Sequence, residues 1–317
     1  MVTNKEINLK IISFYRFVEI KDKNKLKLEL DNFLKKRIIR GTILLSDEGI
    51  NGSLSGAKTS IYECLKFIKN QTKIRKIHIN ENYIDYIPFN RMKVRLKNEI
   101  ISMGVKEIKV SDFSKNHLSP QDWDKFINNK KIKLIDTRNE YEIQIGKFKN
   151  SINPHTKSFR DFTKKLGHLK IKQTDKVGIY CTGGIRCEKA AAYMQLKGFQ
   201  NVFQLNGGIL NYLEYKKKNK STSQWQGECF VFDNRVTVDS NLNPGKYLQC
   251  YGCRMPISKK DTRSKKYLKG VSCPHCYDTR SKEQKNNSQV RQKQIENKQN
   301  KGMSHPFKKL KAIDIFK

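Results

Sequence analysis

One cysteine of the sequence has neighbours of the kinds that make a sulfur reactive. The stretch "YCTGGIRCEKA" (Tyr180–Ala190) places Cys181 directly after the apolar run "KVGIY" and places Arg186 at the start of a helical pattern. Glycines let the main chain curl so that successive N–H groups converge, and a helix N-terminus adds partial positive charge. Both effects stabilise a thiolate, so we expect the pKa of Cys181 to lie below that of a free thiol. The main chain of this loop comes from Thr182, Gly183, Gly184 and Ile185.

The loop predicts a nucleophilic sulfur inside a ring of main-chain amides, which Arg186 closes and where its guanidinium can pair with an anion. Four residues separate Cys181 from Arg186, whereas cysteine phosphatases of related architecture have five, so the ring suits a persulfide or a similarly small group. The alternative is a buried structural cysteine before a glycine turn. Cys187 can form a disulfide with Cys181, or it can simply pack within the first helical turn.

Four further cysteines have the spacing of metal ligands. Two Cys-x2-Cys pairs are separated by nineteen residues, and such pairs can present four thiolates tetrahedrally to zinc. The zinc would be structural, because all four ligands are protein groups and no coordination position stays open. A redox dithiol pair and a module held only by packing are the alternatives. His275 lies inside the second pair, and we expect it to point outward. The candidate ligands are Cys250, Cys253, Cys273 and Cys276.

The elements around Cys181 alternate between strands and helices over residues 115–217. Ser119 is the expected N-cap of the first helix, with Pro120 at its first position. This order predicts an α/β domain whose parallel sheet carries helices on both faces. Active loops of such sheets lie at the carboxyl ends of strands, where Cys181 stands. The strands are expected in "KIKLIDTRNE", "KVGIY" and "NVFQL", and the helices in "LSPQDWDKFI", "FRDFTKKL" and "IRCEKAAAYMQLKGF".

The residues before this domain have a different order of elements. "IISFYRFVEI" is typical of a strand, a helical face follows, and "GTILLSDEGINGSLSG" suggests a hairpin before a second helix and the strand "RKIHIN". The order βαββαβ predicts a ferredoxin-like α+β domain over residues 1–105. Gly49, Gly52 and Gly56 can cradle an anion, although such glycines more often serve turns.

The last third of the sequence is basic and divided by composition. "YKKKNKSTSQW" (Tyr215–Trp225) has the composition of a linker, and a small cysteine-rich module is expected over residues 218–280. Residues 281–317 are basic and almost without apolar side chains, which predicts a disordered tail. Lys216 to Lys220 and this tail can hold RNA electrostatically, or they can be simply solvated.

Aromatic and charged residues are interleaved at the start of the cysteine-rich module. This mixture suits stacking on an unpaired base with a phosphate nearby, although core strand residues are the commoner use of such aromatics. The residues concerned are Trp225, Phe230, Phe232 and Arg235.

The net charge of +35 at pH 7 over 317 residues favours a polyanionic partner, of which nucleic acid is the commonest. Compositional drift towards Lys, Asn and Ile explains part of this excess. The beginning "MVTNKEINLK" has no signal-peptide character, and no apolar run reaches the roughly 18 residues that a membrane helix needs. We therefore expect a cytoplasmic protein with reduced thiols and without membrane contact.

The stretch from about Ser119 to Tyr215 resembles a rhodanese domain. Asp136 to Glu140 resembles the family's Asp-x-Arg motif, Glu142 to Gly146 its Glu-x-x-x-Gly, and Cys181 to Arg186 its active loop. The resemblance implies that Cys181 forms the persulfide, that Arg186 is the loop arginine, and that Asp136 and Arg138 are scaffold or rim residues. The His-Ile pair usual after the glycine is Lys147-Phe148 in this chain.

Longer motifs extend the likeness to about residues 10–280. "SDEGINGSLSG", "CTGGIRCEKA", "GFQNVFQLNGGILNY", "WQGECFVFDNRV" and "GVSCPHC" resemble the oxygen-dependent tRNA uridine hydroxylase (TrhO) family. The likeness implies hydroxylation of carbon 5 of the wobble uridine, tRNA position 34, to 5-hydroxyuridine, with dioxygen as co-substrate and the tRNA anticodon loop as partner. The sequence has no flavin or nicotinamide motif and no evident non-haem iron site. The protein partners are not indicated.

As a hypothesis, Cys181 attacks carbon 6 of uracil or carries a persulfide or an oxidised sulfur. A rhodanese-type sulfurtransferase acting through a Cys181 persulfide is one alternative, and a non-catalytic RNA-binding protein is another.

Overall fold

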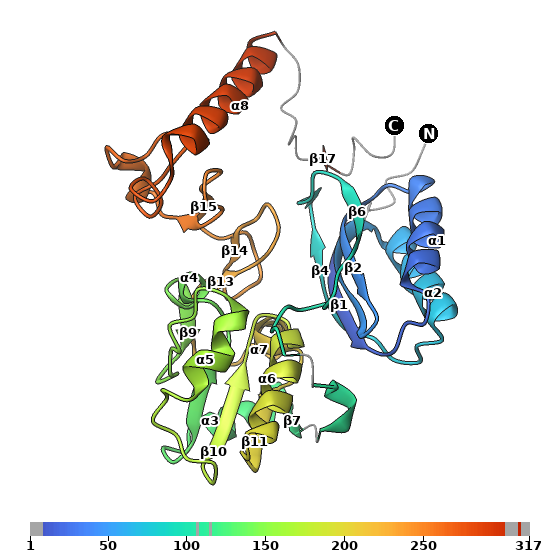
Figure 1. Cartoon of the computed structure of the whole chain (residues 1–317), viewed down its shortest axis with the longest axis vertical. Helices are drawn as coiled ribbons and strands as arrows, with labels where there is room; N and C mark the ends of the chain where they lie inside the picture. The colour runs from blue at the N-terminus through green and yellow to red at the C-terminus, as the bar shows by residue number, and fades with distance from the viewer. Residues whose placement is uncertain (1–8, 106–107, 114–115, 302–309, 312–317) are drawn as a thin grey trace.

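The computed structural model describes residues 9–105, 108–113, 116–301 and 310–311 of the chain. Figure 1 shows the N-terminal domain beside the domain that carries α6, with a third, extended part reaching to α8. Short 3₁₀ turns occur at Val110–Asp112, Phe159–Asp161 and Asp261–Arg263.

The N-terminal domain is the predicted ferredoxin-like α+β sandwich. Its five-stranded sheet has the order β4-β1-β3-β2-β6, in which β6 pairs parallel with β2 and the other neighbours are antiparallel. Two helices cover one face of this sheet (Figure 1). The elements are β1 (Leu9–Phe17), α1 (Lys23–Lys35), β2 (Ile39–Ser46), β3 (Gly49–Ala57), α2 (Lys58–Thr72), β4 (His78–Ile84), β5 (Tyr86–Ile87) and β6 (Met92–Leu96).

Alternation along β1 gives the sheet two different faces. Ile12 and Phe14 pack in the core against the helices, whereas Ile11 and Ser13 line a cavity on the other side. Side chains of a strand alternate between its faces, so one strand serves both the fold and the site. The glycines of β3 allow close packing here: a Cβ at Gly52 would lie 2.8 Å from the Phe14 ring. Close packing, rather than a turn or an anion cradle, therefore accounts for glycine at position 52.

The next domain has the predicted α/β architecture. Its four strands are parallel in the order β7-β11-β10-β8. Helices α3 and α7 pack on one face, and α5 and α6 pack on the other. Ser119 accepts from the amide of Asp122, with Pro120 as first helical residue, as expected. The elements are β7 (Asn116–Leu118), α3 (Pro120–Ile127), β8 (Lys133–Asp136), α4 (Glu140–Ile143), β9 (Gly146–Phe148), α5 (Phe162–Leu166), β10 (Lys176–Tyr180), α6 (Ile185–Leu196), β11 (Asn201–Leu205) and α7 (Gly208–Lys218).

The segment predicted as a linker is mostly ordered against this domain. Helix α7 continues to Lys218, and the buried Lys216 pairs with Asp124 of α3. Trp225 begins β12 (Trp225–Gly227), which pairs antiparallel with β9. The carboxylate of Asp124 and the edge of β9 therefore hold this segment in place. Because Lys216 is buried and paired with Asp124, it is not available to bind RNA.

The cysteine-rich part consists of short hairpins followed by a helix. Its elements are β13 (Cys229–Phe230), β14 (Thr237–Val238), β15 (Leu248–Gln249), β16 (Pro256–Ile257) and α8 (Lys282–Asn300), and β17 (Leu310–Lys311) pairs with β5.

The prediction of a disordered tail from residue 281 is wrong for α8. Ser281 and Gln284 form a capping box that satisfies the first amides of the helix. Arg280 donates to the carbonyl of Gly252 at 2.6 Å, and Arg291 donates to the carbonyls of Tyr251 and Gly270. Composition did not indicate these anchors. Residues 302–309 and 312–317 of the predicted tail lie outside the described residues.

Within the part of the chain that the structure describes, no helix has the length and apolar character needed to cross a membrane.

Candidate active site

Cys181 follows the last residue of β10, and α6 begins at Ile185. The amide of Gly184 donates to the Cys181 sulfur at 3.1 Å. Gly184 has φ 97°, and a Cβ there would lie 2.9 Å from the Tyr15 hydroxyl, so glycine is required. The carbonyl of Cys181 accepts from Ile209 at the start of α7. The loop is therefore held in one conformation from both sides.

The electrostatic surroundings of the Cys181 sulfur favour its ionised form. Burial alone would raise the pKa of Cys181, but the Cys187 thiol, the Arg186 guanidinium and the amides of Cys187 and Arg186 lower it to about 6. By contrast, burial raises the pKa of Cys64 and of Cys229 to about 12. Among these buried thiols, Cys181 is the one prepared to act as a nucleophile near neutral pH.

Cys187 lies beside the reactive sulfur. It is fully buried, its sulfur lies 3.7 Å from the Thr137 hydroxyl, and burial together with the neighbouring Cys181 raises its pKa well above the usual value. All eight cysteines are free thiols in this structure. Cys187 thus keeps its proton, and its neutral thiol favours the ionised form of Cys181. Its redox role remains a prediction.

Arg186 differs from its predicted arrangement. Its guanidinium makes two hydrogen bonds to the Glu142 carboxylate, at 2.6 and 2.8 Å, and a third to the Thr182 hydroxyl at 3.2 Å. Both charged groups are buried. The anion that Arg186 binds is therefore the carboxylate of Glu142 in the same chain. Its charge still lowers the pKa of Cys181, but its hydrogen-bonding edge is already occupied.

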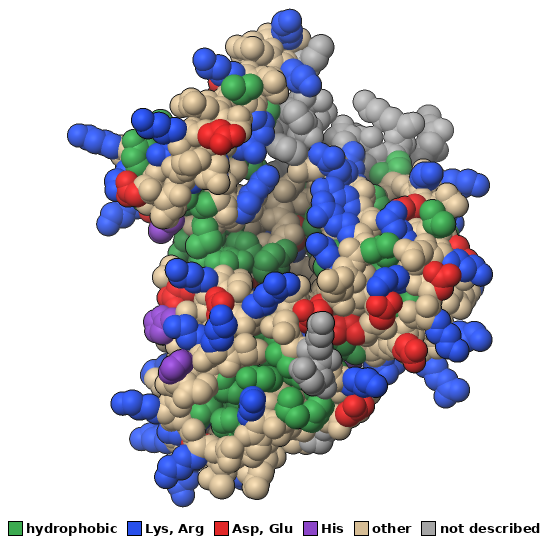
Figure 2. Space-filling model, in the orientation of Figure 1, with side chains coloured by type: hydrophobic (Ala, Val, Ile, Leu, Met, Phe, Trp, Pro, Cys, Tyr) green, Lys and Arg blue, Asp and Glu red, His purple; other side chains and the backbone are tan. Residues whose placement is uncertain are grey.

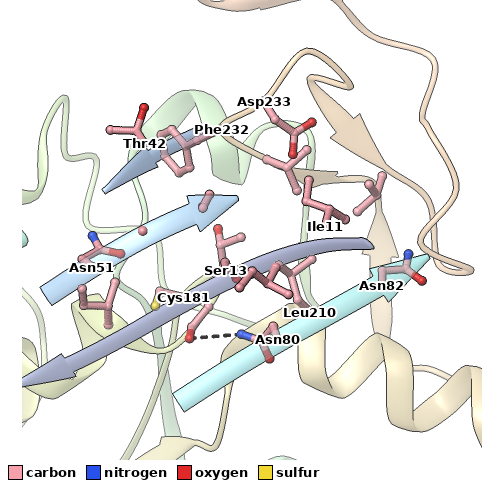
Figure 3. A pocket seen from close by; sticks show the side chains of 18 of the residues that line it. Ile11, Ser13, Thr42, Asn51, Asn80, Asn82, Cys181, Leu210, Phe232 and Asp233 are labelled. Carbon is pink, nitrogen blue, oxygen red and sulfur yellow. Dashed lines mark hydrogen bonds between the residues drawn. The ribbon is translucent and has the colours of Figure 1, made fainter. Parts of the chain in front are cut away.

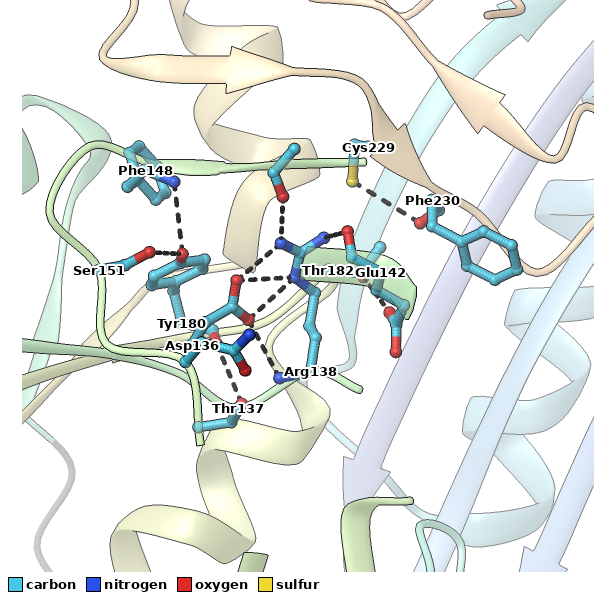
Figure 4. Close-up of polar contacts among 12 residues, drawn as sticks. Asp136, Thr137, Arg138, Glu142, Phe148, Ser151, Tyr180, Thr182, Cys229 and Phe230 are labelled. Carbon is cyan, nitrogen blue, oxygen red and sulfur yellow. Dashed lines mark hydrogen bonds and ion pairs between the residues drawn. The ribbon is translucent and has the colours of Figure 1, made fainter. Parts of the chain in front are cut away.

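Asp136 and Arg138 form the scaffold beneath the loop (Figure 4). Both are fully buried and share a two-pronged ion pair with its shortest contact at 2.7 Å. Arg138 also donates to the carbonyls of Glu142 and Gly146. It thereby fixes the chain that carries Glu142, the partner of Arg186. Of the two predicted roles, scaffold and rim, the burial supports the scaffold.

A cavity of about 550 Å³ lies over the Cys181 loop (Figure 3). The sheet face opposite helices α1 and α2 forms its roof, through β1 to β4, and residues 231–242 form one side. Asn80 of β4 donates to the carbonyl of Gly183 at 3.4 Å, so the roof touches the loop directly. Lys189 of α6 pairs with Glu48 at 2.8 Å and Glu99 at 2.6 Å, which fastens the two domains together.

The polar residues of the roof were missed from the sequence. Ser13, Asn51, Asn80 and Asn82 line the cavity from three neighbouring strands. Amide side chains carry both a donor and an acceptor, which suits a planar ligand with mixed hydrogen-bonding edges. In the sequence these polar residues stand within strands that are otherwise apolar, which was the available signal. Only the packing of the two domains against each other shows that they line a cavity over Cys181.

The predicted aromatic cluster divides by burial. Trp225 and Phe230 are core residues, and Arg235 is paired with Asp233 at 2.7 Å. Phe232 instead is 63% exposed at the cavity, with its ring packed edge-on against Phe230. Only Phe232 of this group is placed to meet a ligand ring.

The four predicted metal ligands come together. The sulfurs of Cys250, Cys253, Cys273 and Cys276 lie within 4.8 Å of one another, with contacts of 3.8 to 4.0 Å. A tetrahedral site with Zn–S bonds of about 2.3 Å requires S···S separations of about 3.8 Å. The cluster can therefore hold a structural metal ion such as zinc. His275 is exposed and faces Asp261 at 3.8 Å, away from the ligand set, as expected for a spacer.

Comparison with known families matches two parts of the chain. Residues 9–100 match the UPF0176 acylphosphatase-like domain, and residues 119–215 match the rhodanese-like domain. The chain therefore carries a rhodanese-like cysteine loop behind a UPF0176 domain.

Solved structures similar to this chain include rhodanese-like proteins. The rhodanese-like domain of an Anabaena sp. protein is 13% identical over 36% of this chain and 80% of that one, with a TM-score of 0.30. A rhodanese-related protein from Thermoplasma volcanium is 24% identical over 32% and 92%, with a TM-score of 0.26. A rhodanese-like domain protein from Staphylococcus aureus is 18% identical over 31% and 90%, with a TM-score of 0.27.

Proposed function

Because the chain has the domain architecture of the TrhO family, a UPF0176 domain followed by a rhodanese domain, we propose that it hydroxylates the wobble uridine of tRNA to 5-hydroxyuridine with dioxygen. Cys181 is the nucleophile of this reaction. The tRNA anticodon loop is the partner, since its bases are unstacked and can enter a cavity without opening a helix.

The observation that carries the proposal is the cavity over the Cys181 thiolate. Its volume of about 550 Å³ admits a pyrimidine ring with part of its ribose, and its roof offers the amides of Asn51 and Asn80 opposite the sulfur. Uracil presents carbonyl acceptors and an imide donor along one edge, which amide side chains complement. A protein that only bound RNA would not need a thiol of lowered pKa at the floor of the same cavity.

The proposed chemistry balances with one co-reactant, a cellular thiol. The Cys181 thiolate adds to carbon 6 of uracil, and the displaced electron pair makes carbon 5 an enolate carbon. Carbon 5 bonds to dioxygen and, with a proton, becomes a hydroperoxide. Two electrons from two thiols, which become a disulfide, cleave the O–O bond to leave a hydroxyl on carbon 5 and water. Loss of the carbon 5 proton expels Cys181 as thiolate and restores the double bond.

The experiment uses the purified chain, unmodified tRNA, a thiol reductant and ¹⁸O₂. We expect 5-hydroxyuridine two mass units heavier than the product formed in ¹⁶O₂, and none from Cys181→Ala. Unlabelled 5-hydroxyuridine formed in ¹⁸O₂ would assign the oxygen to water and overturn the proposed use of dioxygen.

A rhodanese-type sulfurtransferase is the second candidate, supported by the rhodanese match at residues 119–215. In that reaction Cys181 takes a sulfur atom from a donor such as thiosulfate and passes it to a thiol. The amide of Gly184 would then support a persulfide. Thiosulfate-to-cyanide turnover at ordinary enzyme rates, lost in Cys181→Ala, without 5-hydroxyuridine formation, would favour this candidate.

A further inference from the structure

A second cavity, of about 460 Å³, adjoins the cavity over Cys181. The two have four lining residues in common: Thr42, Phe89, Phe232 and Asp233. The two cavities therefore meet at the exposed ring of Phe232. Figure 2 shows the hollow between the C-terminal part and the N-terminal domain, with hydrophobic side chains along one side and Lys and Arg side chains along the other.

The second cavity is lined by three cations. Arg91, directly before β6, and Lys93, within β6, line it together with Arg254, which directly follows the first cysteine pair. Among the residues that the structure describes, none of these three forms an ion pair with a carboxylate. The carboxylate of Asp233 in the lining is already bonded to Arg235 through two oxygens. Burial and the like charges of Arg95 and Arg91 lower the pKa of Lys93.

Three cations that line one cavity repel one another, and an anion would relieve this repulsion. A guanidinium and an ammonium are the groups that bind phosphate oxygens in proteins. Phe232, on the boundary, offers a ring of which 63% is exposed, and an exposed aromatic ring stacks on bases of single-stranded RNA. The arrangement thus has a base platform and an anion site side by side.

We propose that the cavity lined by Arg91, Lys93 and Arg254 binds the backbone phosphate that joins the nucleotide held over Cys181 to its neighbour in the RNA strand, while Phe232 stacks on the base of that neighbour. This inference rests on the proposed function for the nucleotide over Cys181. It adds the path of the strand: from the thiolate past Phe232 towards the cysteine-rich module. Base, ribose and phosphate are covalently joined, so adjoining sites can be filled by one strand.

The test compares two charge-matched double variants in the full chain. Arg91→Gln with Lys93→Gln removes two charges from the second cavity. Lys130→Gln with Lys131→Gln removes two exposed charges from the turn before β8, at the opposite end of the parallel strands from Cys181. The affinity of each for an anticodon stem–loop RNA is measured over a range of KCl concentrations, and thermal denaturation checks the fold.

We expect the first double variant to bind RNA roughly tenfold more weakly. The slope of log K against log salt falls by about 0.7 to 1 for the lost phosphate contact, whereas the control variant keeps both values. Equal losses in the two double variants would overturn the proposal, because they would show an effect of net charge alone. Arg254→Gln, on a separate element, should lower the same slope even if the first variant folds poorly.

Neutral methylphosphonates locate the phosphate. A single methylphosphonate is placed at each linkage flanking the uridine in turn. At one of these linkages it should weaken RNA binding by wild type but not weaken binding by the double variant any further, as expected when the replaced phosphate and the replaced cations are partners. An effect at every linkage, or at none, would overturn the proposal. A third result would also overturn it: inorganic phosphate raises the melting temperature of wild type but not of the double variant, while the double variant keeps its RNA affinity. That result would assign the site to free phosphate.

These binding measurements do not depend on hydroxylation. RNA binding with the expected slope change but no 5-hydroxyuridine would refute the proposed function and leave the phosphate site standing. Hydroxylation by wild type, with the same salt slope in wild type and the double variant, would support the proposed function and refute the phosphate site. A wild type that binds no RNA would also overturn the phosphate site.

Discussion

Replacing Cys187 with alanine tests what sets the reactivity of Cys181. The Cys187 thiol donates to the Cys181 sulfur and is the largest influence that lowers the pKa of Cys181 against burial. A hydrogen bond to a charged group contributes about 1.5 to 3 kcal/mol, and one pKa unit corresponds to 1.36 kcal/mol. Removing this donor should therefore raise the pKa of Cys181 from about 6 by roughly one to two units.

The magnitude appears most clearly near pH 6, where about half of the Cys181 thiols in wild type are ionised. In Cys187→Ala the ionised fraction there should fall to roughly 1 to 10%. Cys187→Ser is the matched control, because its hydroxyl keeps a donor in the same place. At high pH, where Cys181 is fully ionised in every variant, the Cys181 thiolate of Cys187→Ala should react slightly faster than that of wild type, because nucleophilicity increases with pKa.

The assay follows alkylation by iodoacetamide between pH 4.5 and 10, with the modified peptide identified by mass spectrometry because other cysteines react as well. Wild type and Cys187→Ser should show inflections near pH 6, and Cys187→Ala an inflection near 7 to 8. An inflection near 8.5 in wild type would refute the reasoning, as would identical profiles for Cys187→Ala and wild type. A Cys181 that is unreactive at neutral pH would favour a non-catalytic RNA-binding protein.

Three further perturbations follow from the contacts of the site. Burial would raise the pKa of Glu142, but Arg186 holds it below the usual value, so wild type should lose stability as the pH falls below about 4.3. At pH 7 the free energy of unfolding of Glu142→Gln should be about 3 to 5 kcal/mol lower than that of wild type, and the variant should not show this loss of stability in acid. Equal stability of the two proteins at pH 7 would contradict the buried pair. Purified protein should contain one zinc per chain, and Cys250→Ser should lose it and release α8 to proteolysis while Cys181 keeps its reactivity. Less than a tenth of an equivalent in wild type would reject the metal site. Phe232→Leu should lower RNA affinity at least roughly fivefold and Phe232→Tyr should not, because only the aromatic ring stacks on a base; equal affinities would rule out stacking.

Most elements of the N-terminal domain and of the parallel-sheet domain were predictable because the apolar periodicity is strong. Ile12 and Phe14 alternate as a strand requires, and Ser119 with Pro120 marks a helix start. Cys181 was recognisable because its chemistry depends on adjacent residues: the glycines, the strand end and the helix start all lie within a few positions of it.

The parts that sequence patterns missed depend on distant contacts. Arg186 is bonded to Glu142, forty-four positions away, and such pairing leaves no local pattern. Strand β6 is short and carries alternating cations, so "MKVRL" has the composition of a loop. Helix α8 has almost no apolar face, and its order comes from Arg280 and Arg291, which bind carbonyls beside the cysteine pairs. In each case tertiary contacts outweigh local propensity.

The most direct measurement of the central claim is mass spectrometry of tRNA nucleosides from cells that lack this chain. Complementation with wild type should restore 5-hydroxyuridine, and complementation with Cys181→Ser or Cys181→Ala at equal protein level should not. Full restoration of 5-hydroxyuridine by Cys181→Ala would contradict the account.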